Sequence, residues 1–94
     1  MSSRPRARDL GLPFPGTTGP YNAITDIADL WVGSKTIRRD QVATGVTAIV
    51  PRGPDDEMQP VWAGFHALNG NGEMTGTHWI EDAGYFCGPI LITN

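Results

Sequence analysis

Three stretches of the chain alternate apolar residues with polar or small ones, and this period of two is typical of β-strands. They are residues 30–37, 44–50 and 61–68. A polar turn at 38–41 follows the first stretch, and a proline-rich loop at 51–60 separates the last two. Because few polar residues lie on either face of these strands, the pattern predicts a sheet that is covered on both sides.

The pattern changes after the third predicted strand. The sequence "NGNG" (69–72) predicts a tight turn, since Asn and Gly tolerate positive φ. A short helix is expected near residues 77–84, with Thr77 as its N-cap and Gly84 as the glycine that ends it. The apolar run 88–94 predicts a last strand. It stops without a turn or polar tail, so we expect the chain to be truncated at its C-terminus.

The first 22 residues show no sustained periodicity and are rich in Pro and Gly. We therefore divide the chain into an extended N-terminal arm, residues 1–26, and a partial domain, residues 27–94. The arm is expected to lie across a folded body, because its sequence can form few β-ladders.

The composition and charge of the chain exclude several classes of protein. Hydrophobic residues make up 39% of the chain and charged residues 18%, which is not the composition of a disordered protein. The net charge of −3 gives no electrostatic basis for binding nucleic acid. No apolar run approaches the length of a membrane-spanning helix. The single cysteine, Cys87, excludes an internal disulfide and a multi-cysteine zinc site. These features indicate a soluble, cytoplasmic protein.

Phosphate-binding motifs fail on spacing. Gly70, Gly72 and Gly76 form G-x-G-x-x-x-G, one residue longer than the dinucleotide fingerprint. A P-loop needs a lysine directly after its last glycine, and the chain's only lysine is Lys35. We expect no cofactor.

Metal and nucleophile motifs are also incomplete. His66 and His78 lie twelve residues apart and form no H-x-x-x-H pair, so a histidine at the core edge is the simpler interpretation of His66. Ser34 falls within a predicted strand with no evident base beside it. Cys87 precedes an apolar strand, which favours an inert thiol.

Glu73 is the most informative polar residue. It lies where the predicted turn leads into the predicted helix, a position from which loop residues commonly contact ligands. A solvated turn carboxylate is the simpler interpretation of the same residue. The residues alone leave both interpretations open.

Three segments together resemble the start of a known family. They are "RPRARDLGLPFPGTTGPYNAITDI", "TGVTAIVPRG" and "NGNGEMTGTHWIEDAGYFCGPILITN". In this order and spacing they are similar to the N-terminal part of the α-subunit in the DmpA-like L-aminopeptidase/D-Ala-esterase/amidases and the β-peptidyl aminopeptidases. The segment "DIADLWVGSKTI" departs from the family's usual V-P-G-V-x-V-G-H-x-T run, which affects the entry to the first strand.

The resemblance implies an α/β (α+β) fold: the N-terminal fragment of an αββα sandwich, mostly β-strands with one short helix. Such enzymes cleave their own precursor at a Gly-Ser bond, and the freed serine becomes the nucleophile that attacks N-terminal amides or esters. Here that serine would lie beyond Asn94, so the resemblance implies that this chain carries no catalytic residue and is inactive alone. The expected partners are the rest of the α-subunit, the β-subunit, a peptide or amino-acid amide substrate, and further αβ units in a homo-oligomer.

The resemblance also raises the functional interpretation of Glu73, which matches the acid of the family's G-x-G-E motif. Its carboxylate would suit the free amine of a substrate, with Asn71 and Asn69 as weaker companions. The alternative is a standalone β-rich binding or structural module without catalysis. A chain that folds cooperatively alone would favour that alternative.

Overall fold

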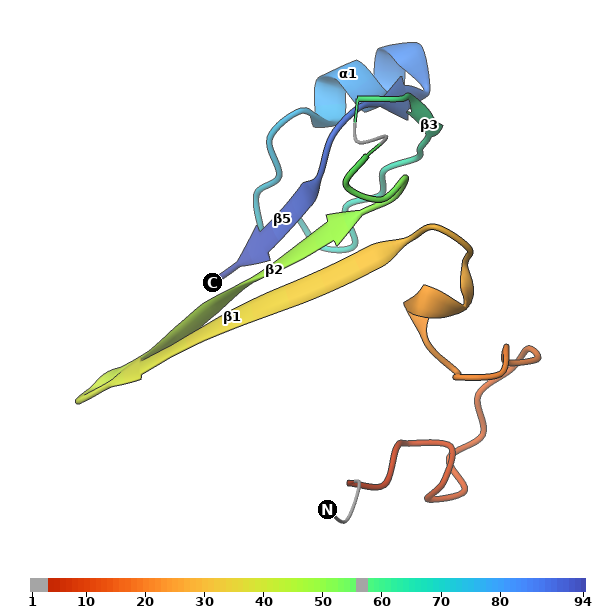
Figure 1. Ribbon diagram of the computed structural model, residues 1–94, viewed down its shortest axis with the longest axis vertical. Coiled ribbons are helices and arrows are strands. Elements are labelled where there is room, and N and C mark those ends of the chain that lie inside the picture. The colour runs from red at the N-terminus through yellow and green to blue at the C-terminus, as the bar shows by residue number, and fades with distance from the viewer. Residues whose placement is uncertain (1–3, 56–57) are drawn as a thin grey trace.

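The structure is a computed structural model that describes residues 4–55 and 58–94 (Figure 1). Most of its regular structure is antiparallel β-sheet with one short α-helix. The elements in chain order are η1 (Ile24–Asp26), β1 (Trp31–Arg39), β2 (Val42–Val50), β3 (Val61–Trp62), α1 (Thr77–Ala83), β4 (Tyr85–Phe86) and β5 (Ile90–Thr93).

Strands β1 and β2 form a long antiparallel hairpin in which all nine residues of each strand are paired. This confirms the first two predicted strands. The predicted turn at 38–41 is too long, because Arg38 and Arg39 continue the ladder and only Asp40 and Gln41 connect the strands. Backbone groups make the ladder, so two exposed arginines do not interrupt it. Asp40 reverses the chain with φ 52°, a conformation that short hairpin turns need.

Strand β5 completes a three-stranded sheet of order β1-β2-β5. It pairs antiparallel with residues 46–49 of β2, so the predicted last strand is confirmed but begins later than expected. Gly88 has φ 92° and Pro89 has no N–H, which delays the ladder until Ile90. At the other end of β5, the Thr93 hydroxyl donates to the Gly45 carbonyl at 2.6 Å.

The third predicted strand, 61–68, is wrong beyond Trp62. Strand β3 pairs with β4, which was not predicted, and the ladder joins only two residues on each side. One further bond, from the Ala63 N–H to the Gly84 carbonyl at 2.9 Å, follows the ladder. The pairing ends there because the neighbouring chain is helical up to Ala83 and has no strand to offer.

Helix α1 confirms the predicted helix and its C-terminal glycine. Gly84 adopts φ 75° and donates its N–H to the Ile80 carbonyl at 2.8 Å, as a C-terminal glycine does. The predicted N-cap is wrong: Thr77 is the first helical residue, and Gly76, with φ 87°, occupies the cap position. A glycine there leaves the start of α1 without a side-chain cap.

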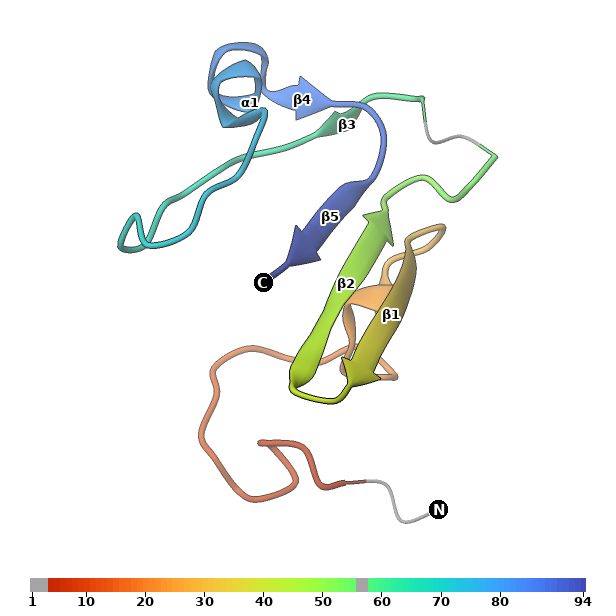
Figure 2. The same ribbon diagram turned by 90° about the vertical axis from the view of Figure 1, so that its left-hand side faces the viewer.

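The N-terminal arm is organised by polar side chains bound to backbone carbonyls. Arg6 Nη1 donates to the Tyr21 carbonyl at 2.7 Å. Arg8 donates through both terminal nitrogens to the carbonyls of Phe14 and Pro15, at 3.1 and 3.0 Å, and its guanidinium lies 5.8 Å from the Phe14 ring centroid. In Figures 1 and 2 the arm lies at the end of the molecule opposite α1. It folds on itself and does not lie across the sheet, because its arginines bond to carbonyls within the arm.

Asp26 fixes the last part of the arm. Its carboxylate accepts from the N–H groups of Tyr21 at 2.9 Å and Ala23 at 3.1 Å. A Cβ at Gly19 would lie 2.5 Å from the Asp26 carboxylate, so a larger residue at this position would displace the side chain that makes these bonds. These contacts give a structural reason for the "GPYNAITD" motif.

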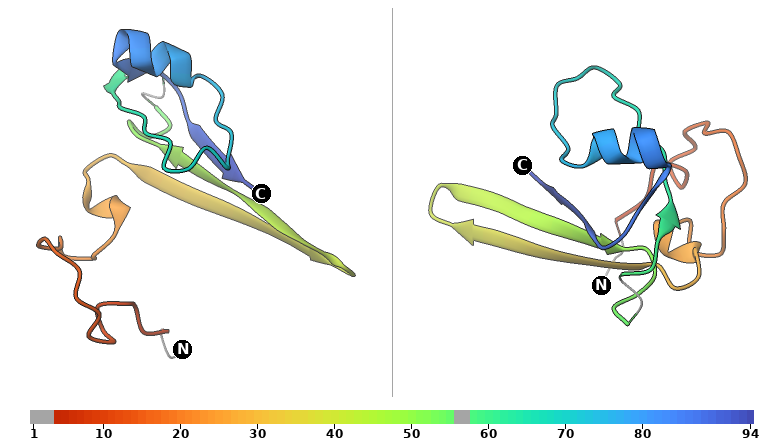
Figure 3. Two further views of the ribbon diagram at one scale, coloured as in Figure 1. Left: turned by 180° about the vertical axis from the view of Figure 1, so that it is seen from behind. Right: turned by 90° about the horizontal axis from the view of Figure 1, so that it is seen from above.

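The part of the chain that the structure describes covers the three-stranded sheet only in part, and most residues of β2 are half-buried. Every residue of β1 is exposed, and no large apolar side chain among residues 4–55 and 58–94 is buried. Figure 3 shows the hairpin projecting well beyond α1. The apolar pattern indicated burial on both sides, but a pattern within one sheet does not identify what covers it.

Within the described residues, no helix has the length and apolar character needed to cross a bilayer.

Candidate functional site

The predicted site lies in the long loop between β3 and α1. The loop reverses at the Asn-Gly sequence, where the Asn69 side-chain carbonyl accepts from the Asn71 N–H at 3.0 Å and Gly70 adopts φ 67° (Figure 2). Such an Asx turn is a local interaction that Asn favours. The reversal confirms the predicted turn and leads the chain back through Glu73 to α1.

Glu73 borders a hollow of about 920 Å³ between this loop, α1 and the C-terminal strands. Of the described residues that line the hollow, only Glu73 carries a charge. They are Ala63, Gly64, Phe65, Glu73, Met74, Thr75, Gly76, Trp79, Ile80, Tyr85, Phe86, Cys87, Pro89, Ile90 and Leu91. The hollow is therefore a mostly apolar surface, with the exposed Glu73 at its border.

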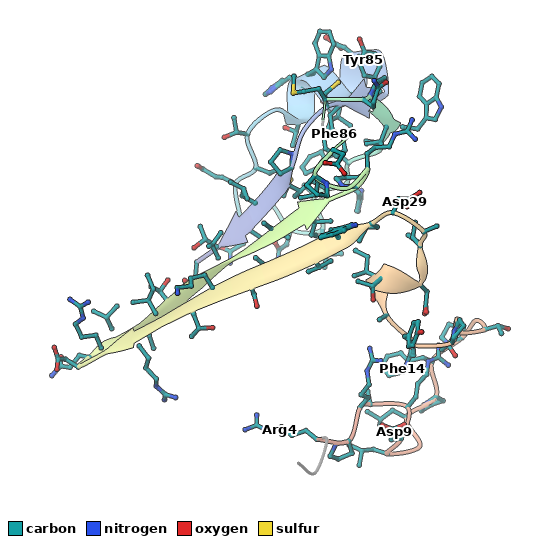
Figure 4. All side chains as sticks on the ribbon, viewed as in Figure 1. Arg4, Asp9, Phe14, Asp29, Tyr85 and Phe86 are labelled. Carbon is teal, nitrogen blue, oxygen red and sulfur yellow. The ribbon has the colours of Figure 1, made fainter. Side chains whose placement is uncertain are left out.

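Two aromatic rings form a fixed part of the wall. Trp79 of α1 and Tyr85 of β4 pack edge to face, with ring centroids 5.6 Å apart and planes at 87°. Gly84 alone separates α1 from β4, and its left-handed conformation turns the chain so that the two elements meet. Figure 4 shows Tyr85 and Phe86 at the end of the molecule that carries α1. Edge-to-face pairs of this kind favour one relative orientation of the rings.

The surroundings of Glu73 determine what its carboxylate can do. Glu73 is exposed in the described part of the chain, so solvent reaches it there and weakens its attraction to a cation. No lysine or arginine is among the described residues that line the hollow.

The structure separates the three predicted site residues. Glu73 lines the hollow, whereas Asn69 and Asn71 do not. The Asn69 side chain is engaged in the turn with Asn71. Binding roles for all three stay predictions, and the geometry gives the two asparagines the task of shaping the loop that carries Glu73.

The other polar candidates are dispersed. Ser34 lies opposite Thr47 in the hairpin ladder. Its partner across the ladder therefore carries a hydroxyl group, which is not a base. His78 lies in the first turn of α1, and neither it nor His66 lines the hollow. Cys87 is exposed and does line it. Across residues 4–55 and 58–94, no group of three His, Cys, Asp or Glu residues could hold a metal ion.

Sequence reasoning missed the apolar wall. The sequence predicts Phe65 within a strand and no role for Tyr85, yet both line the hollow with Glu73. Aromatic residues on both sides of the Asn-Gly turn were the available signal. Only the return of the loop toward β4 shows that they face one space.

Comparisons with known proteins agree on one family. Residues 22–94 match the sequence model of peptidase family S58. Two beta-peptidyl aminopeptidases named BapA, from Sphingosinicella microcystinivorans and Sphingosinicella xenopeptidilytica, are 50% and 46% identical to this chain. The alignments cover 96% and 95% of this chain but 25% and 24% of those relatives. The chain thus spans about a quarter of the length of the curated relatives it matches.

A solved structure extends the comparison to the fold. The L-aminopeptidase D-Ala-esterase/amidase from Ochrobactrum anthropi superposes with a TM-score of 0.82 at 58% sequence identity. The match covers 97% of this chain and 27% of that one. That enzyme is described as a prototype of the serine aminopeptidases and as a new variant of the Ntn hydrolase fold. The expected fold class is therefore confirmed, with this chain folded as part of such a variant.

Proposed function

Because the chain belongs to peptidase family S58, we propose that it forms one quarter of a serine aminopeptidase that hydrolyses N-terminal amino-acid amides, esters or short peptides. The observation that carries this proposal is the superposition of 97% of the chain on an aminopeptidase at 58% identity. At that identity the likeness extends beyond a shared fold to the side chains of this segment.

The proposed enzyme is self-processing, and its nucleophile comes from outside these 94 residues. Acyl transfer by a serine needs an adjacent base and donors for the developing oxyanion. Ser34 faces Thr47 within a β-ladder, which does not support such a role. We therefore propose that this segment is inactive alone and contributes to substrate binding.

Glu73 is the proposed contact for the substrate's free amine. A carboxylate and an ammonium form a charge-assisted hydrogen bond, which is stronger than a neutral one. The lone charge on an apolar hollow supports this role. Asn69 and Asn71 contribute through the Asx turn that leads the chain to Glu73.

We propose that the rest of the α-subunit and the β-subunit pack against the exposed sheet and cover it. Trp31, Ile37 and Val42 are 60%, 49% and 53% exposed on the hairpin, and removing their remaining apolar surface from water stabilises a fold by about 25 cal/mol per Å². Assembly of several αβ units into a homo-oligomer belongs to the same proposal.

A hybrid enzyme tests these assignments. In it, this chain replaces the matching quarter of the Ochrobactrum anthropi aminopeptidase, and kcat/KM is measured on leucine p-nitroanilide and on its N-acetyl derivative. Glu73→Gln is expected to lower kcat/KM for the free-amine substrate about 10–100-fold and to leave any activity on the N-acetyl substrate within about threefold, since a hydrogen bond to a charged group contributes about 1.5–3 kcal/mol.

Glu81→Gln is the matched control. Glu81 is exposed on α1 and does not line the hollow, so kcat/KM should stay unchanged. Equal losses on both substrates in Glu73→Gln would assign that residue a structural role. A folded hybrid without activity would contradict the proposal that this chain forms a quarter of the enzyme.

A further inference from the structure

The loop between β3 and α1 contains two Asn-Gly pairs in direct succession, Asn69-Gly70 and Asn71-Gly72. All four residues are exposed, and in Figure 2 the loop extends away from strands β1 and β2. In such a pair the side-chain amide of the asparagine can be attacked by the backbone nitrogen of the glycine. Glycine favours this attack, because it has no Cβ to shield the nitrogen and leaves the backbone free to turn.

The local structure distinguishes the two asparagines. The Asn69 side-chain carbonyl accepts from the Asn71 N–H at 3.0 Å, and Gly70 has φ 67°. Ring closure at Asn69 must therefore break this bond before the side chain can turn toward the Gly70 nitrogen. Within residues 4–55 and 58–94, neither the Asn71 side chain nor the Gly72 N–H forms a hydrogen bond. The second pair can react without losing an existing contact.

We propose that Asn71 is a site of spontaneous deamidation in which water is the only other reactant. The Gly72 nitrogen bonds to Asn71 Cγ, the bond from Cγ to the side-chain nitrogen breaks, and the Gly72 proton leaves with that nitrogen as ammonia. An attack within one chain is favoured because the reacting groups are already held together. Water then opens the cyclic imide, adding its oxygen to one carbonyl carbon and returning a proton to the Gly72 nitrogen.

The product depends on which carbonyl the water attacks. Attack at the side-chain carbonyl gives aspartate, and attack at the main-chain carbonyl gives isoaspartate, whose backbone contains one more carbon. Both products place a new carboxylate two positions before Glu73, and isoaspartate also lengthens the chain between the Asn69 turn and α1. The reaction needs only Asn71, Gly72 and water, so it is independent of any role of Glu73 in binding substrate.

The test follows the uptake of oxygen-18 from labelled water by the hybrid enzyme at neutral pH. Each event replaces the amide nitrogen with an oxygen from water, and mass spectrometry of peptides locates that oxygen at residue 69 or residue 71. Uptake at Asn71 should be about 2–10-fold faster than at Asn69, which is the factor that one hydrogen bond typically contributes. A synthetic peptide of residues 66–76 lacks the fold that supports the turn and should react at similar rates at both asparagines.

Gly72→Ala tests the attacking nitrogen. A Cβ at Gly72 would meet no atom within 4 Å, and its φ is outside the left-handed region, so the variant should keep the loop conformation. It should slow uptake at Asn71 about tenfold, because the methyl group restricts an approach that glycine allows, and leave uptake at Asn69 unchanged. Gly33→Ala on β1 has equally open surroundings and should alter neither rate.

Asn71→Gln keeps the test decisive if Gly72→Ala fails to fold. Glutamine keeps the amide but must close a larger ring, so uptake at residue 71 should be lost. Three results would overturn the proposal: no uptake at residue 71, equal uptake at both asparagines in the hybrid, or undiminished uptake at residue 71 in Gly72→Ala and Asn71→Gln. The measurement uses no peptide substrate, so its failure is distinguishable from a failure of the proposed aminopeptidase function.

Discussion

The N-terminal arm and the three-stranded sheet reach their shapes through different interactions. In the arm, charged side chains of Arg6, Arg8 and Asp26 bind backbone groups up to fifteen residues away. In the sheet, backbone groups bind one another along two ladders, and the side chains of β1 are exposed.

This difference predicts which substitutions each region tolerates. The arm depends on a few named side chains, because each one fixes several residues of irregular backbone. The sheet depends on the close approach of neighbouring backbones, so added atoms between strands do more harm than the loss of an exposed side chain. Three substitutions in the hybrid enzyme test this, and each is followed by the change in Tm.

Gly45→Ala is expected to have the largest effect. A Cβ at Gly45 would lie 2.7 Å from the Lys35 carbonyl oxygen, which is held in the β1–β2 ladder and cannot move alone. Forcing atoms into occupied space costs about 1–3 kcal/mol, and a clash with backbone that cannot move should cost an amount near the upper end of that range. Gly33→Ala, in the paired strand with open surroundings, should leave Tm nearly unchanged. Equal Tm shifts for Gly45→Ala and Gly33→Ala would contradict the idea that the close approach of the two backbones determines the stability of the sheet.

Asp26→Ala should rank second, at about 2 kcal/mol, since hydrogen bonds to a charged group contribute about 1.5–3 kcal/mol and partial exposure weakens both. The change removes the acceptor for the Tyr21 and Ala23 N–H groups. Asp55→Ala removes the same charge from an exposed loop and should shift Tm very little. If Asp26→Ala and Asp55→Ala lower Tm equally, the net charge, and not these two hydrogen bonds, stabilises the arm.

Arg8→Lys should show the smallest of the three effects, about 1 kcal/mol. Lysine keeps the charge but cannot reach two carbonyls with a planar fork or stack on Phe14 as a guanidinium does. The exposed Arg38 on β1 provides a conservative control, and Arg38→Lys should leave Tm unchanged. A larger Tm shift for Arg38→Lys than for Arg8→Lys would contradict the conclusion that the two-pronged guanidinium of Arg8 stabilises the arm.

Local signals in the sequence predicted the hairpin and the helix. The alternation in β1 and β2, and Gly84 after α1, each act within a few residues, so they could be recognised without the fold. The short β3–β4 pair could not be predicted, because its two-residue strands are separated by the loop and the helix. The arm's bonds depend on which carbonyl each arginine reaches, and no periodic pattern encodes that.

The candidate site was predicted only in part for the same reason. Glu73 was identified from its place between a turn and a helix, which are both local features. The apolar hollow depends on Phe65 and Tyr85, twenty positions apart, meeting around it. Their convergence is a tertiary property, and so is the separation of Asn69 and Asn71 from the hollow.

The strand order β1-β2-β5 also sets an order of folding. A hairpin forms in about 1–10 μs. Its third strand begins only at Ile90, well after Val50, and a ribosome adding about 5–20 residues per second needs several seconds to cover that distance. During that interval the outer edge of β2 has no neighbour and can pair with another chain. The nascent protein is therefore most prone to aggregation between the synthesis of these two strands, and slower translation would lengthen that period.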